Sequence, residues 1–128
     1  MGIKYLWDTN TVIYYLQKQL SVNAETFIDS ILLIDVPAIS AITEIELLCW
    51  KSANENHLVT LKNFIADACV YEIDQEIKNQ TAELRKHYNL KLPDAIIAAT
   101  ALVNKLTFII RNIKDFDKIP TLDFVDPF

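Results

Sequence analysis

The chain has 128 residues, 52% of them hydrophobic, and a formal net charge of −5. This length fits one domain, which is large enough to fold around an apolar core without disulfides or metals as staples. Because Gly2 is the only glycine, a glycine-rich dinucleotide loop and a P-loop are both excluded. The acidic balance also argues against nucleic-acid binding by protein charge alone, so such binding would need cations that offset the carboxylates.

The N-terminal segment has no signal-peptide pattern, and the longest apolar run, residues 95–103, is far shorter than the ~18 residues that span a membrane. We therefore expect a soluble protein of the cytoplasm. The two cysteines, Cys49 and Cys69, form no C-x-x-C pair and have no histidine at ligand spacing. This pattern indicates reduced thiols that are buried inside the protein rather than a disulfide or a zinc site.

Strands and helices are expected to alternate along the chain, judged by the spacing of apolar residues and by capping residues. In chain order, the sequence predicts a strand at 4–7, helices at 10–19 and 25–33, a strand at 36–39, a helix from Ser40 to Trp50, a helix at 57–68, a strand at 70–73, a helix from Asp74 to about Tyr88, an apolar helix at 93–103, a strand at 107–110 and a last short strand at 122–125. Strands that are apolar on both faces are typical of a parallel sheet covered by helices on both sides. We therefore predict an α/β fold with three layers, α/β/α, around a central parallel sheet.

Four acidic residues lie where such a fold gathers ligands. Asp8 directly follows the first strand, Glu44 lies in the first turn after the second strand, Asp94 begins the apolar helix, and Asp115 follows the strand at 107–110. Ligands of parallel sheets bind at the carboxyl ends of the strands. Carboxylates are preferred ligands of Mg²⁺ and Mn²⁺, and paired metals can activate water for phosphoryl displacement. The pattern therefore indicates a metal-dependent active site.

The same acids also have a purely structural explanation. A carboxylate in the first turn of a helix stabilises the helix by ~0.3–1 kcal/mol through the macrodipole, which could account for Glu44 and Asp94. Asp115 could simply begin a turn. Asp8 fits this explanation less well, because an unpaired carboxylate at the end of a central strand would be costly. The positions alone leave both interpretations open.

Four segments of the chain resemble the motifs of the PIN-domain ribonucleases, especially the VapC-type toxins of bacterial toxin–antitoxin pairs. In order, these segments are LWDTNTV at 6–12, SAITE at 40–44, LPDAIIAATA at 92–101 and RNIKDF at 111–116. The third is the most specific. Their order and spacing extend the resemblance over essentially the whole chain.

The resemblance implies one PIN-like nuclease domain over residues 1–128. It implies an endoribonuclease that hydrolyses RNA phosphodiester bonds with Mg²⁺ or Mn²⁺, and that acts as a toxin with a cognate antitoxin and as a homodimer. The catalytic metal ligands would be Asp8, Glu44, Asp94 and Asp115. Supporting roles would belong to Asn10 and Asn112, which would hold acids or water by hydrogen bonds, and to Arg111, which would contact a phosphate.

One position departs from the family pattern. The residue before the Arg-Asn pair is usually Thr or Ser in the family, but here it is Ile110, which removes a hydroxyl that often supports the metal ligands. Apolar helix residues are candidate contacts for the antitoxin or the second subunit. These candidates are Phe27, Ile31, Leu47 and Trp50.

A different enzyme class fits part of the pattern. The segment DTNTV at 8–12 is close to the D-x-D-x-[TV] opening of haloacid-dehalogenase-type phosphatases, in which the first Asp is a nucleophile. Asp115 and Asp117 would then mimic a later metal pair. The position of the second Asp, however, is occupied by Asn10, which cannot exchange the proton that this mechanism requires.

A non-catalytic interaction domain is the other alternative. In such a domain the acids would only bind a basic partner or RNA, without cleavage. The basic residues Arg85, Lys86 and His87, with Lys91, fit either an RNA-facing patch or a solvated helix face.

Overall fold

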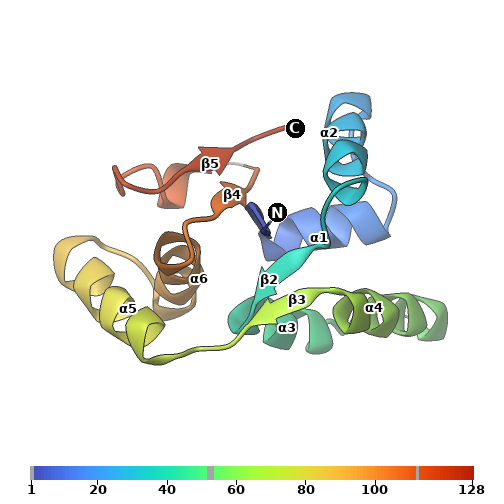
Figure 1. Ribbon diagram of the computed structural model, residues 1–128. Helices are drawn as coiled ribbons and strands as arrows, with labels where there is room; N and C mark the ends of the chain where they lie inside the picture. The colour runs from blue at the N-terminus through green and yellow to red at the C-terminus, as the bar shows by residue number, and fades with distance from the viewer. Residues whose placement is uncertain (1, 52–53, 112) are drawn as a thin grey trace.

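The computed structural model describes residues 2–51, 54–111 and 113–128. Its strands are short and alternate with helices along the chain (Figure 1). The strands are β1 (Tyr5–Trp7), β2 (Ala38–Ser40), β3 (Cys69–Tyr71), β4 (Thr107–Ile109) and β5 (Phe124–Val125). The helices are α1 (Thr9–Leu16), α2 (Val22–Leu32), α3 (Ala41–Leu48), α4 (Glu55–Asp67), α5 (Gln75–His87), α6 (Leu92–Val103) and the 3₁₀ turn η1 (Ile113–Asp115).

All strand pairs within the described residues are parallel. The hydrogen-bonded ladders follow the orders β1-β4-β5 and β2-β3, with Leu6 opposite Phe108 in one ladder and Ile39 opposite Val70 in the other. The two ladders lie side by side through β1 and β2, so that the strands follow one another down the centre of Figure 1. The predicted parallel sheet is therefore confirmed, although its two halves are separate ladders.

The two faces of the sheet bury separate apolar clusters, because successive strand residues point to opposite faces. Leu6 and Phe108 pack with the apolar sides of α5 and α6. Trp7 and Ile109, one residue further along, pack instead with α1, α2, α3 and α4. Figure 1 shows α5 and α6 on one side of the strands and α1 and α2 on the other. The structure thus has the three layers that the sequence predicts.

Side-chain caps fix where most of the helices begin. Asp8, Ser21, Ser40, Asn54 and Asp74 each accept a hydrogen bond from a backbone N–H of the first turn that follows. Such caps satisfy donors that the helix itself leaves unpaired. Asp8 directly follows β1, and Ser40 is the last residue of β2. Helices α1 and α3 therefore start at the same edge of the sheet.

The helices α1 and α6 end in the same way, although neither is followed by glycine. Lys18 and Lys105 adopt left-handed backbone conformations, with φ of 56° and 54°. After α6, Leu106 N–H donates to Ala101 O at 2.9 Å and Lys105 N–H donates to Leu102 O at 3.3 Å, which is the Schellman pattern. A lysine therefore occupies a backbone position that normally favours glycine.

Several expectations for individual side chains are wrong. Both cysteines are free thiols, as predicted. Cys49 is exposed, however, and Cys69 is only half-buried, so the predicted burial is wrong. Ile31 and Leu47 are 3% and 0% exposed, so they belong to the core and cannot contact a partner.

In the described part of the chain, no helix is long and apolar enough to cross a membrane.

Candidate functional site

Asp8 connects the sheet to the first helix. Its backbone N–H donates to Ile109 O at 3.1 Å, which extends the pairing between β1 and β4 by one residue. Its carboxylate Oδ2 accepts from Asn10 N–H at 3.3 Å and caps α1. Thr11 Oγ1 donates to the same Ile109 carbonyl at 3.1 Å. The Asp8 side chain is therefore oriented at the carboxyl edge of the two central strands.

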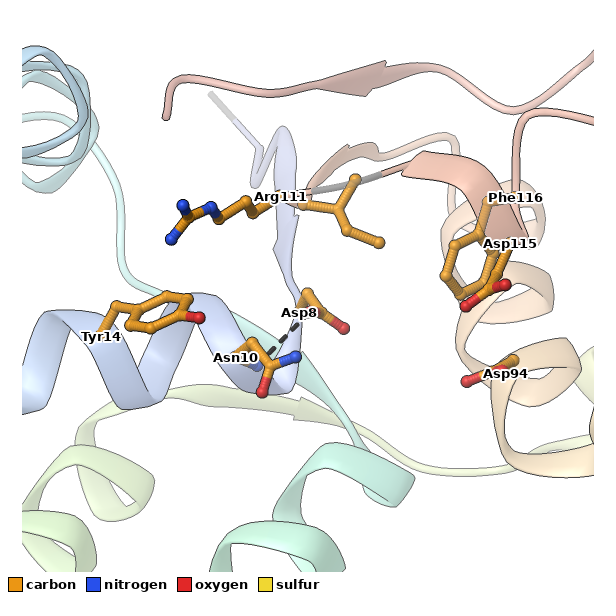
Figure 2. A pocket seen from close by; sticks show the side chains of 8 residues that line it. Asp8, Asn10, Tyr14, Asp94, Arg111, Asp115 and Phe116 are labelled. Atoms are coloured by element: carbon orange, nitrogen blue, oxygen red, sulfur yellow. Dashed lines mark hydrogen bonds between the residues drawn. The ribbon is translucent and has the colours of Figure 1, made fainter. Parts of the chain in front are cut away.

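A cavity of about 320 Å³ opens beside Asp8. Figure 2 shows Asp94 and Asp115 close together on one side of this cavity, with Asp8 and Asn10 opposite them. Asp94 lies in the first turn of α6, and Asp115 ends the 3₁₀ turn that follows β4. The structure thus brings three of the four predicted acids to one cavity. Its lining residues are Asp8, Asn10, Tyr14, Asp94, Ile110, Arg111, Asp115 and Phe116.

The electrostatic environments of Asp8 and Asp94 disfavour their charged forms. Burial raises the pKa of Asp8 to about 6, against the backbone N–H groups that lower it, and the charges of Glu46 and Asp94 raise it further. Burial also raises the pKa of Asp94, and the charges of Asp115 and Glu46 add to this effect, while Lys91 opposes it. A cation bound among these acids would relieve the repulsion.

On α3, the acid whose charge acts on this cluster is Glu46. Neither glutamate of α3 lines the cavity, but the charge of Glu46 raises the pKa of both Asp8 and Asp94. Thr9 Oγ1 donates to Glu46 Oε1 at 2.6 Å and lies 3.0 Å from Thr43 Oγ1. The structure therefore favours Glu46 over Glu44 as the acid of α3 that belongs to the site.

Helix geometry explains the difference. Thr43 is fully buried against the start of α1, and residues three apart lie on the same face of a helix. Position 46 therefore shares this face, while position 44 points about a quarter turn or more away from it. The burial of Thr43, which marks this face, depends on its tertiary contact with Thr9 and could not be inferred from the sequence.

The structure bears differently on each of the residues that were predicted to support the site or to weaken it. The Asn10 side chain lines the cavity, but the hydrogen bond to Asp8 comes from its backbone N–H. The Arg111 guanidinium carbon lies 5.7 Å from the centre of the Tyr14 ring and 5.9 Å from that of Phe128, which holds its charge beside the cavity. Ile110 is 4% exposed and forms part of the apolar core as well as the cavity wall. Asn112 lies outside the described residues.

The carboxylates suit a hydrated divalent cation better than one enclosed by protein. Among residues 2–51, 54–111 and 113–128, no three acidic, cysteine or histidine side chains are arranged to hold a metal ion. Mg²⁺, however, commonly binds through one or two carboxylates and keeps several waters, with substrate phosphates as further ligands. The oxygen donors of Asp8, Asp94 and Asp115 around one polar cavity fit this mode of binding.

The chain was compared with known proteins. Residues 5–122 match the PIN domain family. No curated protein sequence matched the chain. A solved toxin–antitoxin complex from Klebsiella pneumoniae contains a chain that is 33% identical, with a TM-score of 0.78 and coverage of 98% of both chains.

Other solved structures share the fold at lower identity. The DNA-bound VapBC complex of Salmonella typhimurium matches with a TM-score of 0.85 and 23% identity, covering 99% of this chain and 100% of the other. VapBC-1 of nontypeable Haemophilus influenzae matches with a TM-score of 0.79 and 26% identity, covering 98% of each chain. The chain therefore belongs to the PIN-domain family and resembles the VapC-type members of that family.

Proposed function

We propose that this chain is a metal-dependent endoribonuclease and the toxin of a toxin–antitoxin pair. The observation that carries the proposal is the cavity shared by Asp8, Asp94 and Asp115, with Glu46 close enough to raise the pKa of two of these acids. Membership of the PIN family supports a nuclease and removes the phosphatase interpretation of residues 8–12. The site residues proposed here are therefore Asp8, Glu46, Asp94 and Asp115.

Each part of the site has a role in this chemistry. The carboxylates would hold Mg²⁺ or Mn²⁺, which supplies an activated water and offsets charge on the phosphate. Asp8 keeps a fixed orientation because Asn10 N–H holds its Oδ2. Arg111, held near Tyr14 and Phe128, adds a positive charge at the cavity for the non-bridging oxygens of the phosphate.

The nature of the cleavage products tests the mechanism. The purified protein is incubated with single-stranded RNA of mixed sequence, with Mg²⁺ or Mn²⁺ or with a chelator. A metal-activated water needs no neighbouring 2′-hydroxyl, so we expect products without 2′,3′-cyclic phosphates, read by mass spectrometry. Cyclic phosphates formed in chelator would contradict the proposal. Binding without cleavage in any metal would favour the non-catalytic interaction domain.

A cognate antitoxin and a homodimer are part of the same proposal. The relatives from Klebsiella pneumoniae and Haemophilus influenzae were solved as toxin–antitoxin and VapBC complexes. On this chain, α3 and α4 leave large apolar side chains exposed at Ile45, Leu48, Leu58 and Val59, which would favour a partner better than the buried Ile31 and Leu47. Co-purification from the native host should yield a small second protein, and scattering should show a dimer. A monomer at every concentration would contradict the dimer.

A further inference from the structure

A second cavity, of about 430 Å³, adjoins the first. Asp94 and Asp115 belong to its wall as well as to that of the first cavity. The rest of its charged lining is basic and consists of Arg85, Lys91 and Lys118. A protein with a net charge of −5 therefore gathers three positive side chains at one end of its acidic site.

The three basic residues come from different elements and are held around one short turn. Arg85 lies in the last turn of α5, and its Nε donates to Leu90 O at 3.2 Å. Lys118 follows η1, and its Nζ donates to Asn89 O at 2.8 Å. Lys91 occupies the N-cap position of α6 without a side-chain capping bond. The turn at residues 89–91 thus brings together basic side chains that are up to 33 positions apart in the sequence.

These charges keep most of their hydrogen-bonding capacity. A guanidinium has five N–H donors and an ammonium has three, and the bonds to Leu90 and Asn89 use one donor each. In the described part of the chain, the ion pairs within 4.0 Å are those of Glu83 with Lys86 and His87. The donors of Arg85, Lys91 and Lys118 are therefore available to an anion.

We propose that Arg85, Lys91 and Lys118 form a subsite for a phosphate of the RNA backbone that neighbours the phosphate being cut. This inference rests on the proposed function. A nucleic-acid strand whose scissile phosphate lies between Asp8, Asp94 and Asp115 must leave the first cavity, and the shared wall makes the second cavity its adjoining exit. Figure 2 shows Arg111 on the opposite side of the first cavity from Asp94 and Asp115. The strand would therefore meet positive charge in both cavities.

The salt dependence of RNA binding tests the subsite. All proteins carry Asp8→Asn, so that the RNA is not cut, and each is titrated with a fluorescent single-stranded RNA oligonucleotide in Mg²⁺ over a range of salt concentrations. For a single strand, each neutralised phosphate contributes ~0.7 to the slope of log K against log salt. We expect Lys118→Gln and Lys91→Gln each to reduce the slope, by at most the ~0.7 of one phosphate, and Lys118→Arg to restore it.

Lys86→Gln is the matched control. It removes the same charge from the residue next to Arg85, but Lys86 does not line the cavity and pairs with Glu83 at 3.3 Å. The control should keep the slope of the parent. Equal slopes for the parent, Lys118→Gln and Lys91→Gln would overturn the subsite, as would a loss of slope of the same size in Lys86→Gln, or no binding of RNA. If an acidic peptide displaces the fluorescent RNA but unlabelled RNA does not, the subsite is also overturned and the ligand is a protein.

The result separates the subsite from the proposed function. If the chain without Asp8→Asn does not cut RNA in Mg²⁺ or Mn²⁺, the nuclease proposal fails, whatever the slopes show. If that chain cuts RNA while Lys118→Gln and Lys91→Gln leave the slope unchanged, the nuclease proposal stands and the subsite is wrong.

Discussion

At the scale of single residues, Asp8 serves the fold and the site together. Its Oδ2 caps α1, and its pKa is raised to about 6, chiefly by burial. A group whose pKa rises on folding stabilises the native state below its unfolded pKa. That contribution is lost as the pH rises through the folded pKa. For Asp8 the loss falls between pH 3.8 and pH values just above about 6.

Asp8→Asn isolates this effect, because Asn caps helices about as well as Asp and does not titrate. In chelator, we expect the melting temperature of Asp8→Asn minus that of the wild type to increase between pH 4 and pH 7. A rise of the Asp8 pKa from 3.8 to about 6 corresponds to ~3 kcal/mol at most, and solvent screening at this half-buried position reduces that value. Melting curves over this pH range measure it. If the difference between the two melting temperatures stays constant with pH, folding does not raise the pKa of Asp8.

Glu46 and Glu44 provide a matched pair for the assignment on α3. Neither residue lines the cavity, but the charge of Glu46 raises the pKa of Asp8 and Asp94. Glu46→Gln keeps an acceptor for Thr9 but removes the charge, so RNA cleavage should fall by ~10–100-fold or more. Glu44→Gln should retain wild-type cleavage. The opposite order of the two cleavage rates would restore the original assignment to Glu44.

At the scale of elements, the first turn of α6 decides between a site acid and a helix-dipole acid. Burial and the charges of Asp115 and Glu46 raise the pKa of Asp94, so its ionised form is strained at neutral pH without metal. Asp94→Asn should therefore raise the melting temperature in chelator at pH 7 by a few degrees. It should also reduce the shift caused by Mn²⁺, which for a ligand at a hundred times its Kd is ~2.7 kcal/mol.

The helix-dipole interpretation predicts the opposite sign. Loss of a favourable first-turn charge at Asp94 costs ~0.3–1 kcal/mol and leaves any response to metal unchanged. A lower melting temperature of Asp94→Asn in chelator, with an undiminished shift in Mn²⁺, would remove Asp94 from the site. Because the measurement is a melting curve, contaminating nucleases cannot affect it.

The end of α6 offers a test of the fold that is independent of the site. Lys105 has a φ of 54°, where a residue with a Cβ is disfavoured by ~1–2 kcal/mol and glycine is not. Lys105→Gly should therefore stabilise the protein by ~0.5–1 kcal/mol after its greater loss of chain entropy. Lys105→Ala removes the same side chain but keeps the Cβ, so it is the control. Equal unfolding midpoints of the two variants would contradict a left-handed backbone at this position.

The order of the elements could be predicted from the sequence, because apolar spacing and capping residues are local signals. Three site acids could also be placed, because Asp8, Asp94 and Asp115 each adjoin a strand or helix end that the pattern marks. Glu46 was missed because two acids of one short helix differ only in the face that they present. The basic group of Arg85, Lys91 and Lys118 was only partly visible, because Lys118 joins it through a tertiary contact with Asn89.

At the scale of the whole molecule, the three layers explain where the site is. The helices cover both faces of the parallel strands, so the carboxyl edge is where polar side chains from β1, α6 and η1 can meet around open space. The net charge of −5 makes this edge unsuitable for RNA without added positive charge. Divalent cations at the acids, with basic groups on either side, would provide that charge.

The central claim is hydrolysis of RNA by metal held at the cluster that contains Asp8. The most direct measurement compares the cleavage rates of the wild type and Asp8→Asn, purified in the same way, with Mn²⁺ and with chelator. The variant keeps the cap of α1, so its fold should remain intact. We predict cleavage by the wild type only with metal, and a rate at least ~10–100-fold lower for the variant. Equal cleavage by the two proteins, or cleavage by the wild type that chelator does not reduce, would contradict the claim.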